Sequence, residues 1–175
     1  MNEIEFMKTM QEKVAVSAVG PSALRRQGKG VLYATQRVLK GVDLLKLPLD
    51  RREDFYSWLD EQTATILEAM PINSNPWGAA RKALNLFLRD ALYNRYLCKE
   101  YGIDRTEDWL EIPLDSAVAK GLIKNDTQGD LPPWPRLKYL IKDDSDKYQR
   151  FAERLAAEKG IARVHLDMTF WLENR

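Results

Sequence analysis

A lysine and an aspartate, each near the start of an expected helix, are the residues of this sequence whose types and spacing could do chemistry together. Lys82 follows the turn-forming segment NPWG at residues 75–78, and Asp115 follows the extended tripeptide IPL at residues 112–114. The proline of that tripeptide disfavours helical backbone in the residue before it, and an aspartate there can accept hydrogen bonds from the first amides of a helix. An amine that begins one helix and a carboxylate that begins the next can converge on one cleft, so this pair is the expected place for chemistry.

The helix that must position the lysine is expected over residues 77–99. Its apolar residues recur on one face, and Lys82 lies off that face, so the lysine need not be buried in the core. Because Lys82 lies in the first turns, the helix macrodipole disfavours its positive charge. Taken alone, however, Lys82 would be an ordinary solvated lysine and Asp115 a plain helix cap.

The remaining chain shows helical periodicity with start and stop signals, and no convincing alternation typical of strands. Helices are expected over residues 2–18, over 23–42 as two short pieces or one broken helix, after Asp50 with Glu53 completing a capping box, over 137–142, from a cap at Asp144 or Ser145 to Gly160, and over 163–172. The sequence therefore predicts an all-α fold of one domain. In this fold a helical lobe of residues 1–70 packs on a lobe of residues 71–175, with a cleft between them.

Composition and charge narrow the class of protein. Hydrophobic residues make up 45% of the chain and charged residues 30%, and 27 basic against 26 acidic residues give a net charge of +1. No overall basic field therefore attracts nucleic acid. The basic cluster within residues 23–42 is more often a solvated face than a phosphate site, and we interpret it as a solvated face.

The single cysteine, Cys98, excludes a disulfide framework, a cysteine zinc site and a four-cysteine iron–sulfur cluster, and the single histidine, His165, excludes a histidine-rich metal site. No apolar run reaches membrane-spanning length and no signal peptide is recognised, so we expect a cytosolic, that is cytoplasmic, protein.

Three motifs together resemble the helix-hairpin-helix DNA glycosylases. The first is GAARKA at residues 78–83, after a hairpin-like turn; the second is IPLDSAVA at residues 112–119; the third is VHLDMTFWL at residues 164–172. Their order, and the long helix between the first two, are most similar to the archaeal 8-oxoguanine DNA glycosylase branch.

This resemblance implies a DNA glycosylase with associated lyase activity that excises an oxidised purine such as 8-oxoguanine. Lys82 would attack the deoxyribose C1′ and form a Schiff base, while Asp115 would position groups, transfer protons and stabilise the cationic sugar. Asp167 and Trp171 would face a purine turned out of the duplex, and Leu86 stands where the family places an aromatic wall of the base pocket.

The same resemblance implies how DNA is held and what else the protein needs. Backbone amides of the turn at Trp77, Gly78, Ala79, Ala80 and Arg81 would bind a DNA phosphate. The partner would be damaged double-stranded DNA rather than a membrane, we expect a monomer, and no metal or organic cofactor is implied.

Two other interpretations of the same residues stay open. The chain could be a non-enzymatic helical module that binds DNA or protein and retains the glycosylase fold, or an ordinary helical bundle in which Lys82 is solvated. Geometry distinguishes them. If the Lys82 ammonium and the Asp115 carboxylate do not open into one cleft, both catalytic roles fail together.

Overall fold

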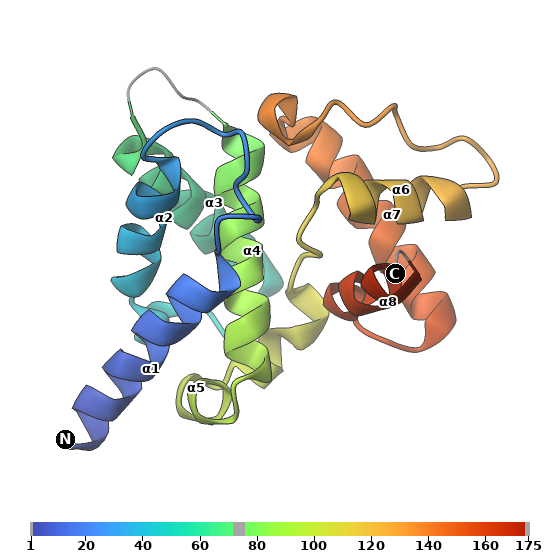
Figure 1. Ribbon diagram of the computed structural model, residues 1–175. Helices are drawn as coiled ribbons and strands as arrows, with labels where there is room; N and C mark the ends of the chain where they lie inside the picture. The colour runs from blue at the N-terminus through green and yellow to red at the C-terminus, as the bar shows by residue number, and fades with distance from the viewer. Residues whose placement is uncertain (1, 72–75, 174–175) are drawn as a thin grey trace.

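A computed structural model describes residues 2–71 and 76–173, and every regular element in these ranges is helical (Figure 1). The α-helices are α1 (Glu3–Ala18), α2 (Val31–Lys40), α3 (Arg52–Ala69), α4 (Trp77–Tyr93), α5 (Arg95–Tyr101), α6 (Ser116–Asn125), α7 (Lys142–Lys159) and α8 (Leu166–Glu173). Short 3-10 helices connect them: η1 (Leu44–Lys46), η2 (Ile103–Trp109), η3 (Leu137–Tyr139) and η4 (Arg163–His165). The expected all-α class is confirmed.

Two clusters of buried hydrophobic side chains divide the helices into two lobes. The first cluster joins α1–α5, and the second joins α6, α7 and α8 with the segment that begins at Ile112 (Figure 1). The chain passes from one cluster to the other between Leu110 and Ile112 rather than near residue 70. The expected boundary was too early because α4 packs on α1, α2 and α3 and so belongs to the first lobe.

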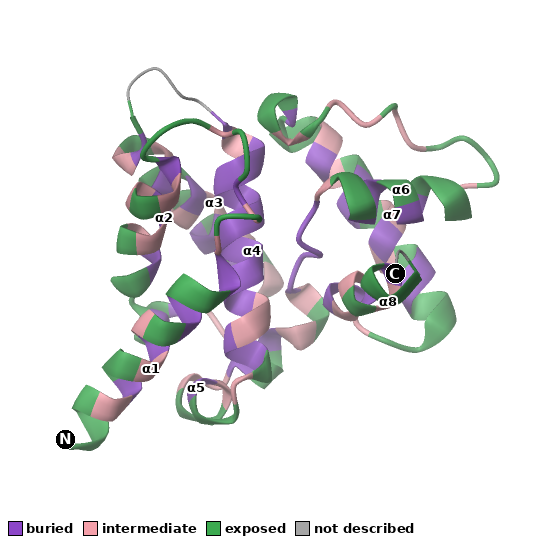
Figure 2. Cartoon of the chain, viewed as in Figure 1, coloured by how far each residue is buried: buried purple, intermediate pink, exposed green. Residues whose placement is uncertain are grey.

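Helix α4 is the central element, and all of residues 78–88 are buried (Figure 2). The sequence predicted one apolar face, yet a helix covered on both sides is buried all round, whatever its pattern. Here α1, α2 and α3 of the first lobe pack on α4, and η3 and α7 contact it as well. Lys82, which the sequence pattern did not require to be buried, is only 8% exposed as a result.

Several helix ends differ from the expected ones for local reasons. The helix expected over residues 77–99 is divided at Asn94, whose side chain accepts hydrogen bonds from the amides of Tyr96 and Leu97 and so starts α5. The predicted capping box at Asp50 is not formed, so this prediction is wrong. Helix α3 begins at Arg52, and the Asp50 carboxylate instead lies 2.5 Å from the Arg105 guanidinium.

Other ends were misplaced in the same way. Asp144 and Ser145 lie inside α7 and do not cap it, although Gly160 ends that helix as expected. The structure shows Gly160 in the left-handed conformation. Within residues 23–42 the structure has α2 alone as a helix, and the helix expected over residues 137–142 is the single turn η3.

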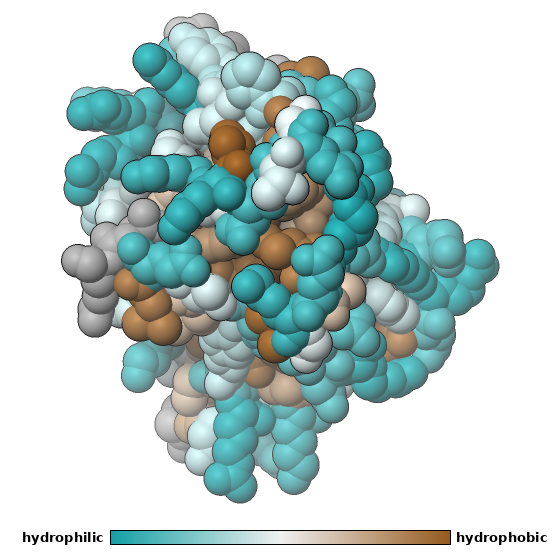
Figure 3. Space-filling view, turned by 90° about the vertical axis from the view of Figure 1, so that its right-hand side faces the viewer, coloured by the Kyte–Doolittle hydropathy of each residue, from teal (hydrophilic) through white to brown (hydrophobic). Residues whose placement is uncertain are grey.

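The second lobe is held together by close packing of α6 on α8. Gly121 of α6 faces Phe170 of α8 so closely that an added Cβ would overlap the Phe170 ring, with its Cε1 atom at 2.8 Å. Viewed from the side of the second lobe, the surface is mainly hydrophilic, with hydrophobic side chains gathered toward its centre (Figure 3).

Replacing Gly121 by alanine should therefore destabilise the protein. The gain in helix propensity, about 1 kcal/mol, is outweighed by overpacking against Phe170, so we expect a net loss of roughly 1–2 kcal/mol in the free energy of unfolding. Urea denaturation measures it. The control is Gly20→Ala, because a Cβ at Gly20 meets nothing within 4 Å. Equal stabilities of the two variants would contradict the proposed close contact.

Candidate functional site

Lys82 of α4 and the first residue before α6, Asp115, meet at the junction of the two lobes. The Lys82 ammonium lies 3.1 Å from the Oδ2 atom of Asp115 and donates to the carbonyl oxygen of Ala23 at 3.1 Å. The other carboxylate oxygen, Oδ1, accepts hydrogen bonds from the amides of Ala117 and Val118 at 2.9 and 3.0 Å. The predicted helix cap at Asp115 is confirmed, and one carboxylate both starts α6 and faces the amine.

The segment before Asp115 is extended and is fixed to α7 by one side chain. The Ile112 amide donates to Oε1 of Gln149 at 3.1 Å, and the Ile112 carbonyl accepts from Nε2 of Gln149 at 2.8 Å. Pro113 favours this extended backbone in the residue before it. The α7 helix thus supports the segment that delivers Asp115 to the lysine.

Directly before Ile112, Glu111 forms a buried ion pair with Arg81 of α4. The Arg81 Nε atom donates to Oε2 of Glu111 at 2.9 Å, and the side chains are only 3% and 4% exposed. Arg81 also donates to Thr63 at 2.9 Å and Asp60 at 2.8 Å, and Asn85 donates to Glu111 at 2.8 Å. Because Arg81 and Glu111 are the neighbours of Lys82 and of the extended segment, this pair sets how the amine and the carboxylate approach each other.

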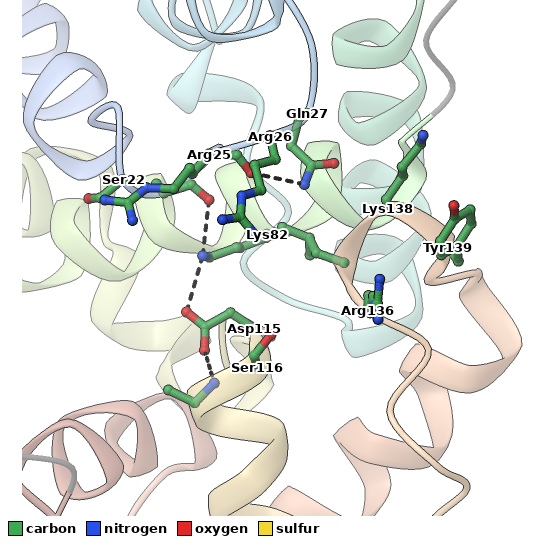
Figure 4. Close-up of a pocket in the computed structure, with 13 residues that line it drawn as sticks. Ser22, Arg25, Arg26, Gln27, Lys82, Asp115, Ser116, Arg136, Lys138 and Tyr139 are labelled. Carbon is green, nitrogen blue, oxygen red and sulfur yellow. Dashed lines mark hydrogen bonds and ion pairs between the residues drawn. The ribbon is translucent and has the colours of Figure 1, made fainter.

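A pocket of about 620 Å³ opens beside the pair (Figure 4). Lys82 lies at its centre, between residues of the loop before α2 and residues of η3, with Asp115 on the side of α6. The geometric condition for a shared site, that amine and carboxylate open into one cleft, is met. The complete lining is Ser22, Ala23, Arg25, Arg26, Gln27, Lys82, Asp115, Ser116, Ala117, Arg136, Leu137, Lys138 and Tyr139.

The charge of this lining is strongly one-sided. Asp115 is its acidic residue, and the basic ones are Lys82 together with Arg25, Arg26, Arg136 and Lys138. The chain as a whole carries a net charge of only +1, so positive charge is concentrated here. A pocket with such walls favours an anionic ligand.

The other predicted base contacts lie outside this lining. Asp167 and Trp171 are on α8, and Leu86 is a buried residue of α4 that packs in the first core. The Asp167 carboxylate is ion-paired with the Arg89 guanidinium. Burial raises the pKa of Asp167 above its ordinary value; the positive charge of Arg89 opposes this shift and the negative charge of Asp115 adds to it. The predicted base-binding roles of Asp167, Trp171 and Leu86 stay predictions.

The predicted phosphate contact at the start of α4 does not fit the structure. Residues 78–81 are buried, Trp77 is partly buried, and η3 covers Gly78 so closely that a Cβ there would lie 2.5 Å from the Leu137 carbonyl oxygen. The amides of Ala79 and Ala80 already donate to the Pro76 carbonyl oxygen. The side chain of Arg81 is committed to Glu111. Asn75, the first residue of the expected turn, lies outside the described residues.

Several residues of the site were missed by the sequence analysis. Glu111 has no local signal that identifies its partner thirty positions earlier. The sequence predicts a solvated face for Arg25 and Arg26. Both side chains are exposed, but they also border the pocket. Tyr139 is the aromatic residue of the lining and is 61% exposed. The proline-rich loop that precedes Tyr139 was the one sequence feature that could have indicated this part of the site.

Among residues 2–71 and 76–173, no group of three or more histidine, cysteine or acidic residues could hold a metal ion. None of the described helices combines the length and apolarity needed to cross a membrane. Comparisons with family models, with curated proteins and with solved structures gave no match to this chain.

Removing the guanidinium of the buried pair should be costly. Arg81→Met leaves Glu111 as an unpaired buried charge, and we expect a loss of about 3–5 kcal/mol in the free energy of unfolding, measured by urea denaturation. The matched control is Arg105→Met, whose partner Asp50 is at the surface and whose loss should cost less than about 1 kcal/mol. Similar losses in both variants would show that the Arg81–Glu111 pair does not determine the junction.

Proposed function

We propose that this protein is a DNA glycosylase with associated lyase activity that removes an oxidised purine, such as 8-oxoguanine, through an imine on Lys82. The observation that carries the proposal is the Lys82–Asp115 pair at 3.1 Å in a pocket with basic walls. An amine and a carboxylate at this distance can exchange a proton, and the basic walls suit a polyanionic substrate. The finer fold, a two-lobed helix-hairpin-helix glycosylase, is part of the same proposal.

The pair supports a defined sequence of bond changes. A proton of the Lys82 ammonium first passes to Asp115. The neutral amine then attacks C1′ of the nucleotide as the bond from C1′ to the base breaks. The base leaves with the bonding electrons and takes the proton from Asp115, which is thereby a carboxylate again. Opening of the sugar between C1′ and its ring oxygen then gives an imine to Lys82. Loss of a proton from C2′ expels the 3′ phosphate, and water releases Lys82. The Asp115 carboxylate stabilises the positive charge that develops on the sugar.

The pocket is compatible with a nucleotide turned out of a duplex. Its volume of about 620 Å³ lies within the range of about 300–1,000 Å³ that is usual for small-molecule sites. C1′ cannot be reached inside the base stack, so the damaged nucleotide has to rotate outward. The exposed ring of Tyr139 offers a surface on which a base can stack, as aromatic residues do in grooves that bind nucleic acids.

One observation favours the non-enzymatic alternative. Lys82 is largely buried and bonded to both Ala23 and Asp115, which is also what an ion pair that only joins α4 to α6 would look like. Such a protein would still bind DNA through its basic pocket walls but would form no covalent bond with it. The two functions are therefore separated by chemistry rather than by binding.

The first test is covalent trapping. Borohydride supplied during incubation with duplex DNA containing 8-oxoguanine or an abasic site should reduce the imine and leave a stable protein–DNA adduct, and Lys82→Gln should abolish it. The matched control is Lys120→Gln on the exposed side of α6, which does not line the pocket and should trap as well as the parent. An unchanged adduct yield in Lys82→Gln would assign the nucleophile to another amine.

The second test separates the two roles of Asp115. Asparagine caps helices as well as aspartate does, so Asp115→Asn should leave the melting temperature nearly unchanged. Loss of the proton acceptor and of the negative charge should slow single-turnover base release by roughly two or more orders of magnitude. Asp43→Asn is the control, because Asp43 caps η1 outside the pocket. Equal rates for Asp115→Asn and the parent would leave Asp115 with its capping role alone.

A further inference from the structure

Two loops on different sides of the pocket each present two cationic side chains. Arg25 and Arg26 come from the loop before α2, whereas Arg136 lies directly before η3 and Lys138 lies within it (Figure 4). All four residues are exposed. Lys82, at the centre of the pocket, lies between the two pairs.

None of these four cations is in an ion pair with any described residue, whereas many other arginines of the chain are. Unpaired cations at the mouth of a pocket keep their donors available for a ligand, and a guanidinium matches the oxygens of a phosphate with two parallel hydrogen bonds. Arginines in ion pairs are Arg51, Arg52, Arg81, Arg89, Arg105, Arg154 and Arg163.

Each of these two loops also contains a residue with an unusual backbone conformation. Arg26 (φ 65°) and Arg136 (φ 68°) are the non-glycine residues with left-handed backbone in the described part of the chain, and each belongs to one loop. Arg136, with ψ 150°, lies in a region that is otherwise almost restricted to glycine. Such backbone costs free energy and persists where the surrounding structure imposes it, often at sites that bind ligands.

We propose that the two loops form a phosphate clamp, in which Arg25 and Arg26 bind one backbone phosphate of DNA and Arg136 and Lys138 bind another. The nucleotide between them is then held with its C1′ toward Lys82. This inference rests on the proposed function, because it takes DNA as the ligand. It replaces the turn at residues 77–81 as the place where the strand is held, since that turn is covered by η3.

The clamp also accounts for how a nearly neutral chain can bind a polyanion. Phosphate contacts position the strand without reading its sequence, so four well-placed cations suffice where a global basic field is absent. They should make binding dependent on salt, because each phosphate contact releases condensed cations from the duplex.

The test is equilibrium binding of the full chain to a fluorescent duplex, with and without 8-oxoguanine, over about 50–200 mM salt. The variants are Arg25→Ala with Arg26→Ala, and Arg136→Ala with Lys138→Ala, all in Lys82→Gln protein so that no chemistry intervenes. Each double variant should weaken binding to both duplexes roughly tenfold and reduce the magnitude of the log–log salt slope by about 0.9, because each pair is proposed to neutralise one phosphate.

The matched control removes the same charge elsewhere. Arg37 and Lys40 are exposed on α2, do not line the pocket and form no ion pair with a described residue, so Arg37→Ala with Lys40→Ala should keep the parent slope. An unchanged slope in either pocket variant overturns the clamp, and so does an equal change in the α2 control, which would indicate only a general effect of charge.

Borohydride trapping with protein that retains Lys82 separates this inference from the proposed function. If the protein is trapped on DNA but the salt slopes of both pocket variants are unchanged, the clamp is wrong and the proposed glycosylase activity is retained. Reduced pocket slopes without any trapping would keep the clamp and leave a DNA-binding protein that does no chemistry at C1′.

Discussion

The buried ion pair between Arg81 and Glu111 is the constraint on which the rest of the structure depends. Moving two charges out of water costs several kcal/mol, and here the cost is offset by the pair itself and by hydrogen bonds to Asp60, Thr63 and Asn85. The pair fixes α4 of the first lobe to the point where the chain crosses into the second. Each partner lies beside the residues of the site, since Lys82 follows Arg81 and the segment that ends at Asp115 follows Glu111.

The same logic extends along α4, where several polar side chains also connect the helix to the second lobe. Lys82 meets Asp115, Arg89 meets Asp167, and the Tyr93 hydroxyl lies 2.8 Å from Nδ1 of His165. These contacts explain how a helix buried over most of its length retains charged residues, because every buried charge needs a partner. Within the pocket the amine is paired with the Asp115 carboxylate, whereas the cations of the rim are exposed to solvent. This arrangement suits the proposed reaction of a sugar held by its phosphates.

Much of the fold was predictable because its causes are local. The periodicity of α1, the Pro-Leu-Asp start of α6 and the glycine that ends α7 each depend on neighbours within a turn or two, and all three agree with the structure. The division at Asn94 and the true start of α3 were missed, since several competing caps fit a local pattern equally well. The second buried face of α4 was missed for another reason. The residues of a helix do not show what will pack against it, so the burial of Lys82 could not be predicted from the pattern of α4.

The sequence by itself determined the helical class and the candidate pair, because a lysine after a turn and an aspartate after Ile-Pro-Leu are recognisable from adjacent residues. Only the tertiary structure decided that the two meet, since the 3.1 Å contact joins residues of two lobes, which the Arg81–Glu111 pair also connects. It also decided where the positive charge gathers. Arg25 and Arg136 are far apart in the chain, and their shared pocket exists because Ala23, Lys82 and η3 come together around α4. Local patterns specify elements, whereas distances between distant residues are set by how those elements pack.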